Sequence, residues 1–167
     1  MAKTLFISPL YVKQKTLIKG NLDNDKMLQF IDIAQEIHIQ NVIGTDLKDR
    51  LESGISADDL TANESDLLSD YIMPALAHWT MVEFLPYSNF SISNKGVFKE
   101  SAENSESATS DDIEFLMNKQ RDVAMYWNNR LIDYLCYNSD LFPEYTTNID
   151  EDVKPKRDET YPSWMGL

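Results

Sequence analysis

Residues 63–99 constrain the fold most, because a long helical pattern there passes into a pattern of period two. Over residues 64–85 the apolar side chains recur mostly at steps of three and four, which is typical of a helix with one buried face. Trp79, Leu76 and Val82 lie on that face, and we place all three in the core. Other helices must cover a face with side chains of this size.

After Pro86 the period changes to two, and the turn-forming residues Asn94-Lys95-Gly96 interrupt the alternation. This pattern predicts a β-hairpin over about residues 88–100. A two-stranded ribbon is marginal in water by itself, so the hairpin either lies on its own helices or adds to a sheet of a neighbouring chain. We favour the second, with these assembly residues: Phe90, Ile92, Lys95, Val97 and Phe98.

Periodicity and capping signals predict further helices over residues 9–16, 25–42, 46–52 and 111–137. Pro74 lies inside the long central helix, where it should cause a kink or a break. From the flanking helices we add Ile31, Trp127 and Leu131 to the core. Ile33 and Ile37 should widen the apolar side of the helix over residues 25–42, and the apolar stripe of the last helix should include Leu116 and Val123. The fold class is therefore mainly α, a small bundle of about four to five helices with one projecting β-hairpin and an extended C-terminal tail.

Two segments are poor in residues that a core would bury. Residues 101–110 are rich in serine and glutamate, and we expect a mobile acidic linker inside a helical domain of residues 1–149. Residues 150–167 have no period, yet they contain Tyr161, Trp164 and Met165. We interpret these residues as an extended docking tail that takes part in assembly, with a disordered tail as the alternative.

No residue pattern in the chain marks a catalytic, cofactor-binding or metal site. His38 lies on an apolar helix side with no histidine or cysteine three or four residues away, so a hydrogen-bonded core histidine is expected there. The single cysteine, Cys136, rules out an intrachain disulfide and should be a small buried side chain. We therefore predict a protein that is not an enzyme and that uses no cofactor.

The formal net charge of −13 restricts the possible partners. Binding to nucleic acid without sequence preference relies on Lys and Arg displacing counterions, and anionic membranes also attract basic segments. Neither partner suits so acidic a chain. The N-terminal residues do not form a signal peptide, and no apolar run approaches a membrane span, so we expect synthesis in a reducing cytoplasm.

The order of these segments resembles the head–tail connector, or head-completion, proteins of tailed bacteriophages, most closely those of Bacteroidetes and crAss-like phages. The resemblance rests on IAQEIHIQNVIGTDL, YIMPALAHWTMVEFLPY, the hairpin run ISNKGV and QRDVAMYWNNRLIDYL. It covers about residues 5–145, and the first two runs are its most specific parts.

This resemblance implies a virion structural protein in the neck, at the head–tail junction, made in the host bacterial cytoplasm. Such proteins form a ring, usually twelve-fold, below the portal. The implied partners are its own copies, the portal protein and a tail or second ring protein. DNA would pass through the lumen without specific binding, and an acidic lumen would suit that role because it repels phosphates.

Two other classes of protein are weighed against a ring subunit. A helical bundle with a carboxylate metal centre needs Glu-x-x-His pairs, but Gln35 and Ala75 stand three residues before the two histidines. A small acidic adaptor or DNA-mimic protein that binds a host protein remains the alternative, because the net charge alone is compatible with it.

Overall fold

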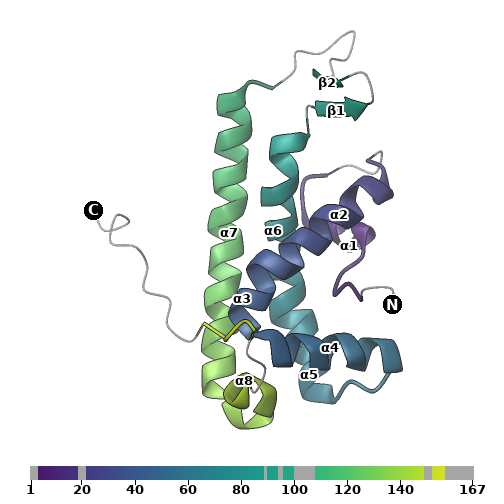
Figure 1. Ribbon diagram of the computed structural model, residues 1–167. Coiled ribbons are helices and arrows are strands. Elements are labelled where there is room, and N and C mark those ends of the chain that lie inside the picture. Colours follow the sequence, from purple (N-terminus) through teal and green to yellow (C-terminus); the bar gives the residue numbers. More distant parts are fainter. Residues whose placement is uncertain are drawn as a thin grey trace, which may run out of the picture.

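The structure is a computed structural model that describes residues 4–18, 22–88, 90–93, 96–99, 108–148 and 152–156. For residues 91–93 and 96–99 it describes the backbone alone. Helices make up most of the described chain, which confirms the predicted α class (Figure 1). Two antiparallel helices, α6 (Met73–Phe84) and the long α7 (Ser110–Tyr137), form the axis of the bundle, and the other helices pack around them.

The N-terminal part forms a hairpin of helices on one side of α6. Helix α1 (Pro9–Lys15) begins at Ser8, whose side chain accepts a hydrogen bond from the Tyr11 backbone N–H, and Pro9 occupies the first helical position. Helix α2 (Asn24–Ala34) is capped by Asp23 and crosses α6. The predicted starts of both helices are confirmed within one residue.

Helix α2 continues through a wide π-helical turn, η1 (Gln35–Ile39), into α3 (Gln40–Ile43). In η1 the backbone N–H of Gln40 donates to the carbonyl of Gln35, five residues earlier, so the turn holds one residue more than an α-helical turn. The extra residue rotates the side chains that follow. The core positions therefore move from Ile31 and Ala34 to Ile39 and Val42.

Gly44 turns the chain between α3 and α4 (Thr45–Ala57), which is longer than the predicted helix over residues 46–52. The turn requires glycine, because its φ of 81° and ψ of 166° lie in a region that other residues avoid. Helix α5 (Ala62–Leu67) then starts with a capping box between Thr61 and Glu64.

A second wide turn, η2 (Leu68–Ile72), joins α5 to α6 (Met73–Phe84). Pro74 is the second residue of α6, and a proline ring in a regular helix meets the carbonyl four residues back, here that of Asp70. The regular α-helix is interrupted at this point, because the Met73 N–H donates to the Leu68 carbonyl, five residues back. This interruption just before Pro74 agrees with the predicted kink or break. Trp79, Leu76 and Val82 are buried on α6, as predicted.

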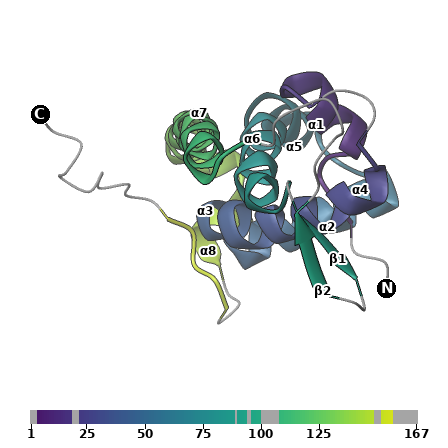
Figure 2. The ribbon, with the colours of Figure 1, turned by 90° about the horizontal axis from the view of Figure 1, so that it is seen from above.

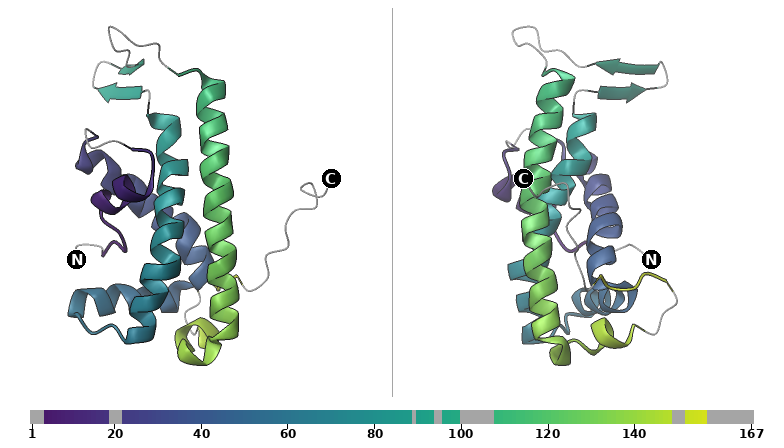
Figure 3. Two further views of the ribbon diagram at one scale, coloured as in Figure 1. Left: turned by 180° about the vertical axis from the view of Figure 1, so that it is seen from behind. Right: turned by 90° about the vertical axis from the view of Figure 1, so that its left-hand side faces the viewer.

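Past α6, a 3₁₀ turn, η3 (Leu85–Tyr87), leads to two antiparallel strands, β1 (Phe90–Ser93) and β2 (Gly96–Lys99). The Cα register pairs Ile92 with Val97. The strands lie at the end of the bundle and extend over the side that carries α2 (Figures 2 and 3). The turn between them and most of the predicted linker lie outside the described residues.

Helix α7 (Ser110–Tyr137) starts within one residue of the predicted position, with Thr109 and Asp112 forming a capping box. It runs back along α6 to the opposite end, where η4 (Ser139–Leu141) and α8 (Pro143–Thr147) close the bundle. Phe142 and Tyr145 are buried there and anchor α8.

Residues 152–156, here called the C-terminal strap, pack against the turn between α3 and α4. The Thr45 backbone N–H donates to the Val153 carbonyl at 3.0 Å, and the Lys156 N–H donates to the Asn41 carbonyl at 3.2 Å. The Thr45 hydroxyl donates to an oxygen of the Asp152 carboxylate at 2.9 Å. The segment predicted as a separate tail thus begins by binding the helical body.

One hydrophobic core runs between α2, α4, α6 and α7. Its fully buried side chains include Met27, Ile31, Leu47, Leu67, Ile72, Leu76 and Leu131. Trp127, predicted in the core, packs against it from a half-buried position at the edge of α7, with the Arg130 guanidinium 4.9 Å from its ring. Cys136 was predicted to be buried and this is wrong: it lies on the outer side of α7 and is exposed.

Candidate functional site

The outer side of α7 carries a row of exposed large apolar side chains, here called the α7 face. Helix α7 turns Ala124, Leu131 and Leu135 toward the core. The predicted buried stripe of this helix included Leu116 and Val123, but both are exposed because the true stripe is rotated toward Ala124. The α7 face consists of Phe115, Leu116, Val123, Tyr126 and Tyr137, of which Tyr137 is 90% exposed.

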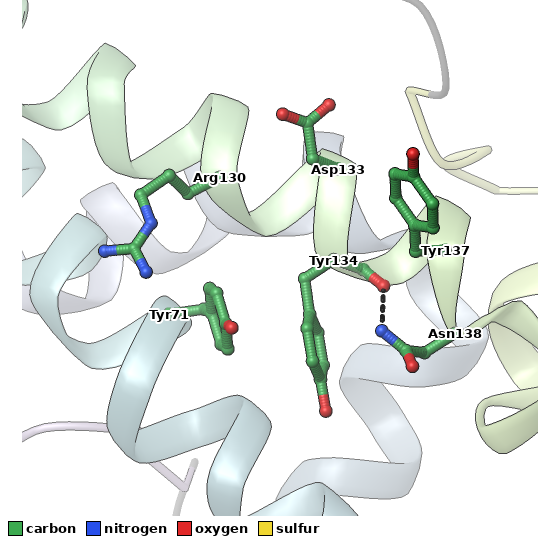
Figure 4. A pocket seen from close by; sticks show the side chains of 6 residues that line it. All are labelled: Tyr71, Arg130, Asp133, Tyr134, Tyr137 and Asn138. Atoms are coloured by element: carbon green, nitrogen blue, oxygen red, sulfur yellow. Dashed lines mark hydrogen bonds between the residues drawn. The ribbon is translucent and has the colours of Figure 1, made fainter.

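At the α8 end of this face lies a pocket of about 330 Å³, here called the tyrosine pocket (Figure 4). Its lining comes from η2, from the last two turns of α7 and from the residue that follows α7: Tyr71, Arg130, Asp133, Tyr134, Tyr137 and Asn138. These side chains offer ring faces, one cation and one carboxylate. Such a lining suits an extended peptide that carries aromatic or proline residues and charges of both signs.

Stacking of two tyrosines organises the tyrosine pocket. The rings of Tyr71 and Tyr134 stack with centroids 4.3 Å apart, and the Arg130 guanidinium lies 5.5 Å from the Tyr71 centroid. Burial raises the pKa of Tyr134, and negative charge at Tyr71, Asp66 and Asp70 raises it further. Tyr134 therefore keeps its proton at neutral pH and can donate a hydrogen bond.

Below the surface, His38 joins helix η1 to α6 and α7 through a stacked network. Its ring lies 3.8 Å from that of Trp79 and parallel to it, and its Nε2 lies 2.7 Å from Glu83 Oε1. Trp79 Nε1 donates to Asn128 Oδ1 on α7 at 3.2 Å. The prediction of a hydrogen-bonded histidine is confirmed, although its partner Glu83 was not foreseen.

The pKa of His38 lies below its ordinary value. Burial lowers this pKa. The hydrogen bond to Glu83 and the negative charge of Glu83 raise the pKa, but by less than burial lowers it. The unfolded chain therefore binds a proton at His38 more readily than the folded chain does. Neutral His38 therefore favours the folded state. This stabilisation is fully present above the pKa of the unfolded chain, about 6.5, and is lost as the pH falls toward the lower pKa of the folded protein.

A pH titration of stability tests this assignment. Between pH 7.5 and 5.5, the wild type is expected to lose more free energy of unfolding than His38→Gln, which cannot take up the proton. Urea denaturation at each pH, followed by far-UV circular dichroism, gives the two slopes. Parallel slopes for the two proteins would show that another group causes the pH dependence.

Two ion-pair clusters fix the α4 end of the bundle. Lys48 is buried and lies 3.0 Å from both Glu36 and Glu52. Arg50 binds Glu64 through Nε at 2.8 Å and Nη2 at 3.0 Å. Burial raises the pKa of the Glu64 carboxyl, but hydrogen bonds from Thr61 and Arg50 outweigh it and leave the pKa below its ordinary value. These contacts join α4 to its neighbours, and we assign them a structural role.

A second exposed apolar surface, here called the α2 face, consists of Leu28 and Ile33 on α2 and Ile37 on η1. Ile33 and Ile37 were predicted to widen a buried stripe, but both are exposed, because α6 and α1 cover only the opposite side of this helix. Tyr87 and Phe90 are exposed near the strands, and the Tyr87 ring lies 5.5 Å from that of Phe30 on α2.

The predicted assembly residues are only partly described. Phe90 is 46% exposed at the start of β1, as its predicted role requires. Ile92, Val97 and Phe98 lie on the paired strands, but their side chains are outside the described part of the structure. Lys95, Tyr161, Trp164 and Met165 also lie outside the described residues.

Sequence reasoning missed the tyrosine pocket, although one signal for it was present. Tyr134 and Tyr137 are three residues apart on α7 and therefore neighbours on its surface. Tyr71 comes from a distant part of the chain, and only the packing of η2 on α7 brings it to Tyr134.

Comparisons with known proteins identify a family but no named relative. Over the described part of the chain, no helix is long and apolar enough to cross a membrane. No curated protein and no solved structure matches the chain. A family model matches residues 39–154, more than half of the chain. The matched region holds helices α4 to α8, the tyrosine pocket and most of the strap, and the chain belongs to this family of unknown function (DUF6712).

Proposed function

We propose that this protein is a structural subunit of a bacteriophage head–tail connector, whose copies form a ring, expected to be dodecameric, below the portal. The ring extends the DNA channel and offers a platform to the tail. Its partners are neighbouring copies, the portal protein and a tail or second ring protein. The subunit acts through its shape and surfaces, with no catalytic residue or cofactor.

The observation that carries this proposal is the position of the strand pair relative to the α2 face. The strands β1 and β2 extend from the end of the bundle over the side that carries α2. A ribbon of two four-residue strands is marginal alone, and its outer edges offer unpaired backbone groups. The α2 face, formed by helix α2 and η1, exposes Leu28, Ile33 and Ile37. Together they supply edge hydrogen bonds and apolar area for a neighbouring copy.

A ring also requires that each subunit has two different contact surfaces. A closed ring requires heterologous contacts, in which one surface of each copy binds a different surface of the next. This strand-bearing side supplies one such surface. The formal charge of −13 supports the same proposal, since an acidic lumen keeps DNA from adhering while it passes.

Negative-stain imaging of this protein mixed with the portal protein of the same genome tests the function. A ring stacked below the portal is expected, and its symmetry gives the copy number. Mass spectrometry of purified virions provides an independent measurement. Absence from virions, together with recovery of a host DNA-binding protein in a pull-down, would replace the connector proposal with an acidic adaptor.

Deletion of residues 90–98 is expected to leave the helical body folded and to abolish ring formation, because the two strands lie at the end of the bundle. The substitution Ile37→Glu should weaken the ring as well, since it places a charge in the apolar α2 face. Ring formation is read by imaging and folding by far-UV circular dichroism. Leu141→Glu, at an apolar residue of similar exposure on the opposite end, is the matched control. An unfolded deletion variant would show that the strands belong to the core of the subunit.

A further inference from the structure

The C-terminal strap ends close to the C-terminal end of α7. The Lys156 carbonyl accepts a hydrogen bond from the Tyr145 hydroxyl at 3.4 Å, and that hydroxyl lies 3.7 Å from Cys136 Sγ. Cys136 directly precedes Tyr137, which lines the tyrosine pocket. The chain therefore leaves the strap at the α8 end of the α7 face, with residues 157–167 still to follow.

We propose that residues 157–165 bind along the α7 face of their own subunit and run toward the N-terminal end of α7. In this arrangement the charged residues Arg157, Asp158 and Glu159 cross the tyrosine pocket. The aromatic residues Tyr161 and Trp164 cover the apolar part of the face around Tyr126 and Val123. This inference does not rest on the proposed ring or on the portal.

The length of the segment matches the length of the face. Tyr126 lies ten residues before Cys136, which corresponds to about 15 Å along an α-helix. Five extended residues from Lys156 to Tyr161 span up to about 17 Å, and nine residues to Met165 span up to about 30 Å. The aromatic residues thus reach Tyr126 and Val123 without displacing the strap.

The order of charges along the two partners also matches. Moving along α7 from Tyr137 toward its N-terminus, the pocket presents first Asp133 and then Arg130. Leaving the strap, the segment presents first the cation Arg157 and then the anions Asp158 and Glu159. Opposite charges therefore face each other in this direction of binding, whereas the reverse direction would pair like charges.

The apolar residues of segment 157–165 are suited to cover the rest of the α7 face. Phe115 and Tyr126 are 61% and 58% exposed, and Val123 lies between them. Aromatic side chains with a nearby proline are suited to such a surface, because they bury a large area at a small entropic cost. The sequence Tyr161-Pro162-Ser163-Trp164-Met165 provides this chemistry within reach.

Disulfide trapping in the full-length chain tests the proposal. Cys136→Ser removes the natural thiol, and Tyr126→Cys with Ser163→Cys provides one thiol on the face and one on the segment. A disulfide within a single chain is expected in most molecules, because a short tether gives a millimolar effective concentration. The control pair Leu10→Cys with Ser163→Cys has similar exposure on α1, across the bundle from α7, and should form little of it.

Non-reducing electrophoresis and peptide mass spectrometry separate the outcomes. A disulfide between two chains would mean that the segment binds a neighbouring copy, and this result would overturn the proposal. Equal trapping in both pairs, or none in either, would also overturn it. Because Tyr126 and Leu10 are exposed, neither substitution removes a core side chain.

Charge reversal changes the rate of disulfide trapping in a way that a change in folding alone would not explain. Arg130→Glu should slow intramolecular trapping of the Tyr126→Cys and Ser163→Cys pair, and added Asp158→Lys and Glu159→Lys should restore the rate. Failure of this rescue, with the fold intact by circular dichroism, would count against the proposed direction of binding.

Discussion

Replacing Trp79 by alanine is expected to lower the free energy of unfolding by about 3–5 kcal/mol. The indole, on α6, is buried against η1 and α7, where it stacks on His38 at 3.8 Å and donates a hydrogen bond to Asn128. Truncation leaves a cavity and removes the partner of a buried amide oxygen, and both effects destabilise. Urea denaturation followed by far-UV circular dichroism measures the loss.

Two companion variants separate these contributions. Trp79→Phe keeps most of the ring but removes the N–H, so a loss of about 1–3 kcal/mol is expected from the unpaired Asn128 oxygen. Trp127→Ala changes a half-buried indole and should cost less than Trp79→Ala. If Trp79→Ala cost no more than Trp127→Ala, the stacked network around His38 would not be a central part of the core.

Gly44→Ala is expected to destabilise the protein and to release the C-terminal strap. The backbone conformation at Gly44 costs any other residue about 1–3 kcal/mol. A Cβ there would also lie 2.7 Å from Pro155 Cγ and Cδ and 2.8 Å from Asn148 Oδ1, so the strap must move away. Hydrogen exchange should accelerate at the Thr45 and Lys156 amides, which bond across this contact.

Gly54→Ala provides the matched control for this prediction. Gly54 lies inside α4, and its added Cβ would meet the flexible end of the Leu60 side chain. Alanine is also the better helix former, so a small change of either sign is expected. Unchanged exchange at Thr45 and Lys156 in Gly44→Ala would mean that the strap does not depend on this turn.

Much of the helical fold was predictable from local patterns, and the errors have a common physical origin. Caps such as Ser8 and a continuous apolar stripe fix where a helix begins and which face it buries. The wide turn η1 adds one residue, so the core positions Ala34 and Ile39 are five residues apart. A regular period of 3.6 residues carried through this turn therefore places Ile37 on the buried side, although it is exposed. Ile33 precedes the turn and is exposed because α6 and α1 cover only the opposite side of α2.

The candidate surfaces were less predictable, because they depend on packing between distant segments. Tyr71 and Tyr134 stack across 63 positions of sequence, and no local pattern records that contact. Cys136 was misplaced for a related reason. Both sides of α7 are rich in apolar residues, so composition alone does not say which side faces the core.

The unbroken length of α7 has a mechanical consequence. A helix of 28 residues extends about 42 Å, and this one runs from the strand end of the bundle to the α8 end. It fixes the separation between the strands at one end and the exit of the C-terminal segment at the other. The single helix therefore keeps the two ends of the subunit at a fixed separation.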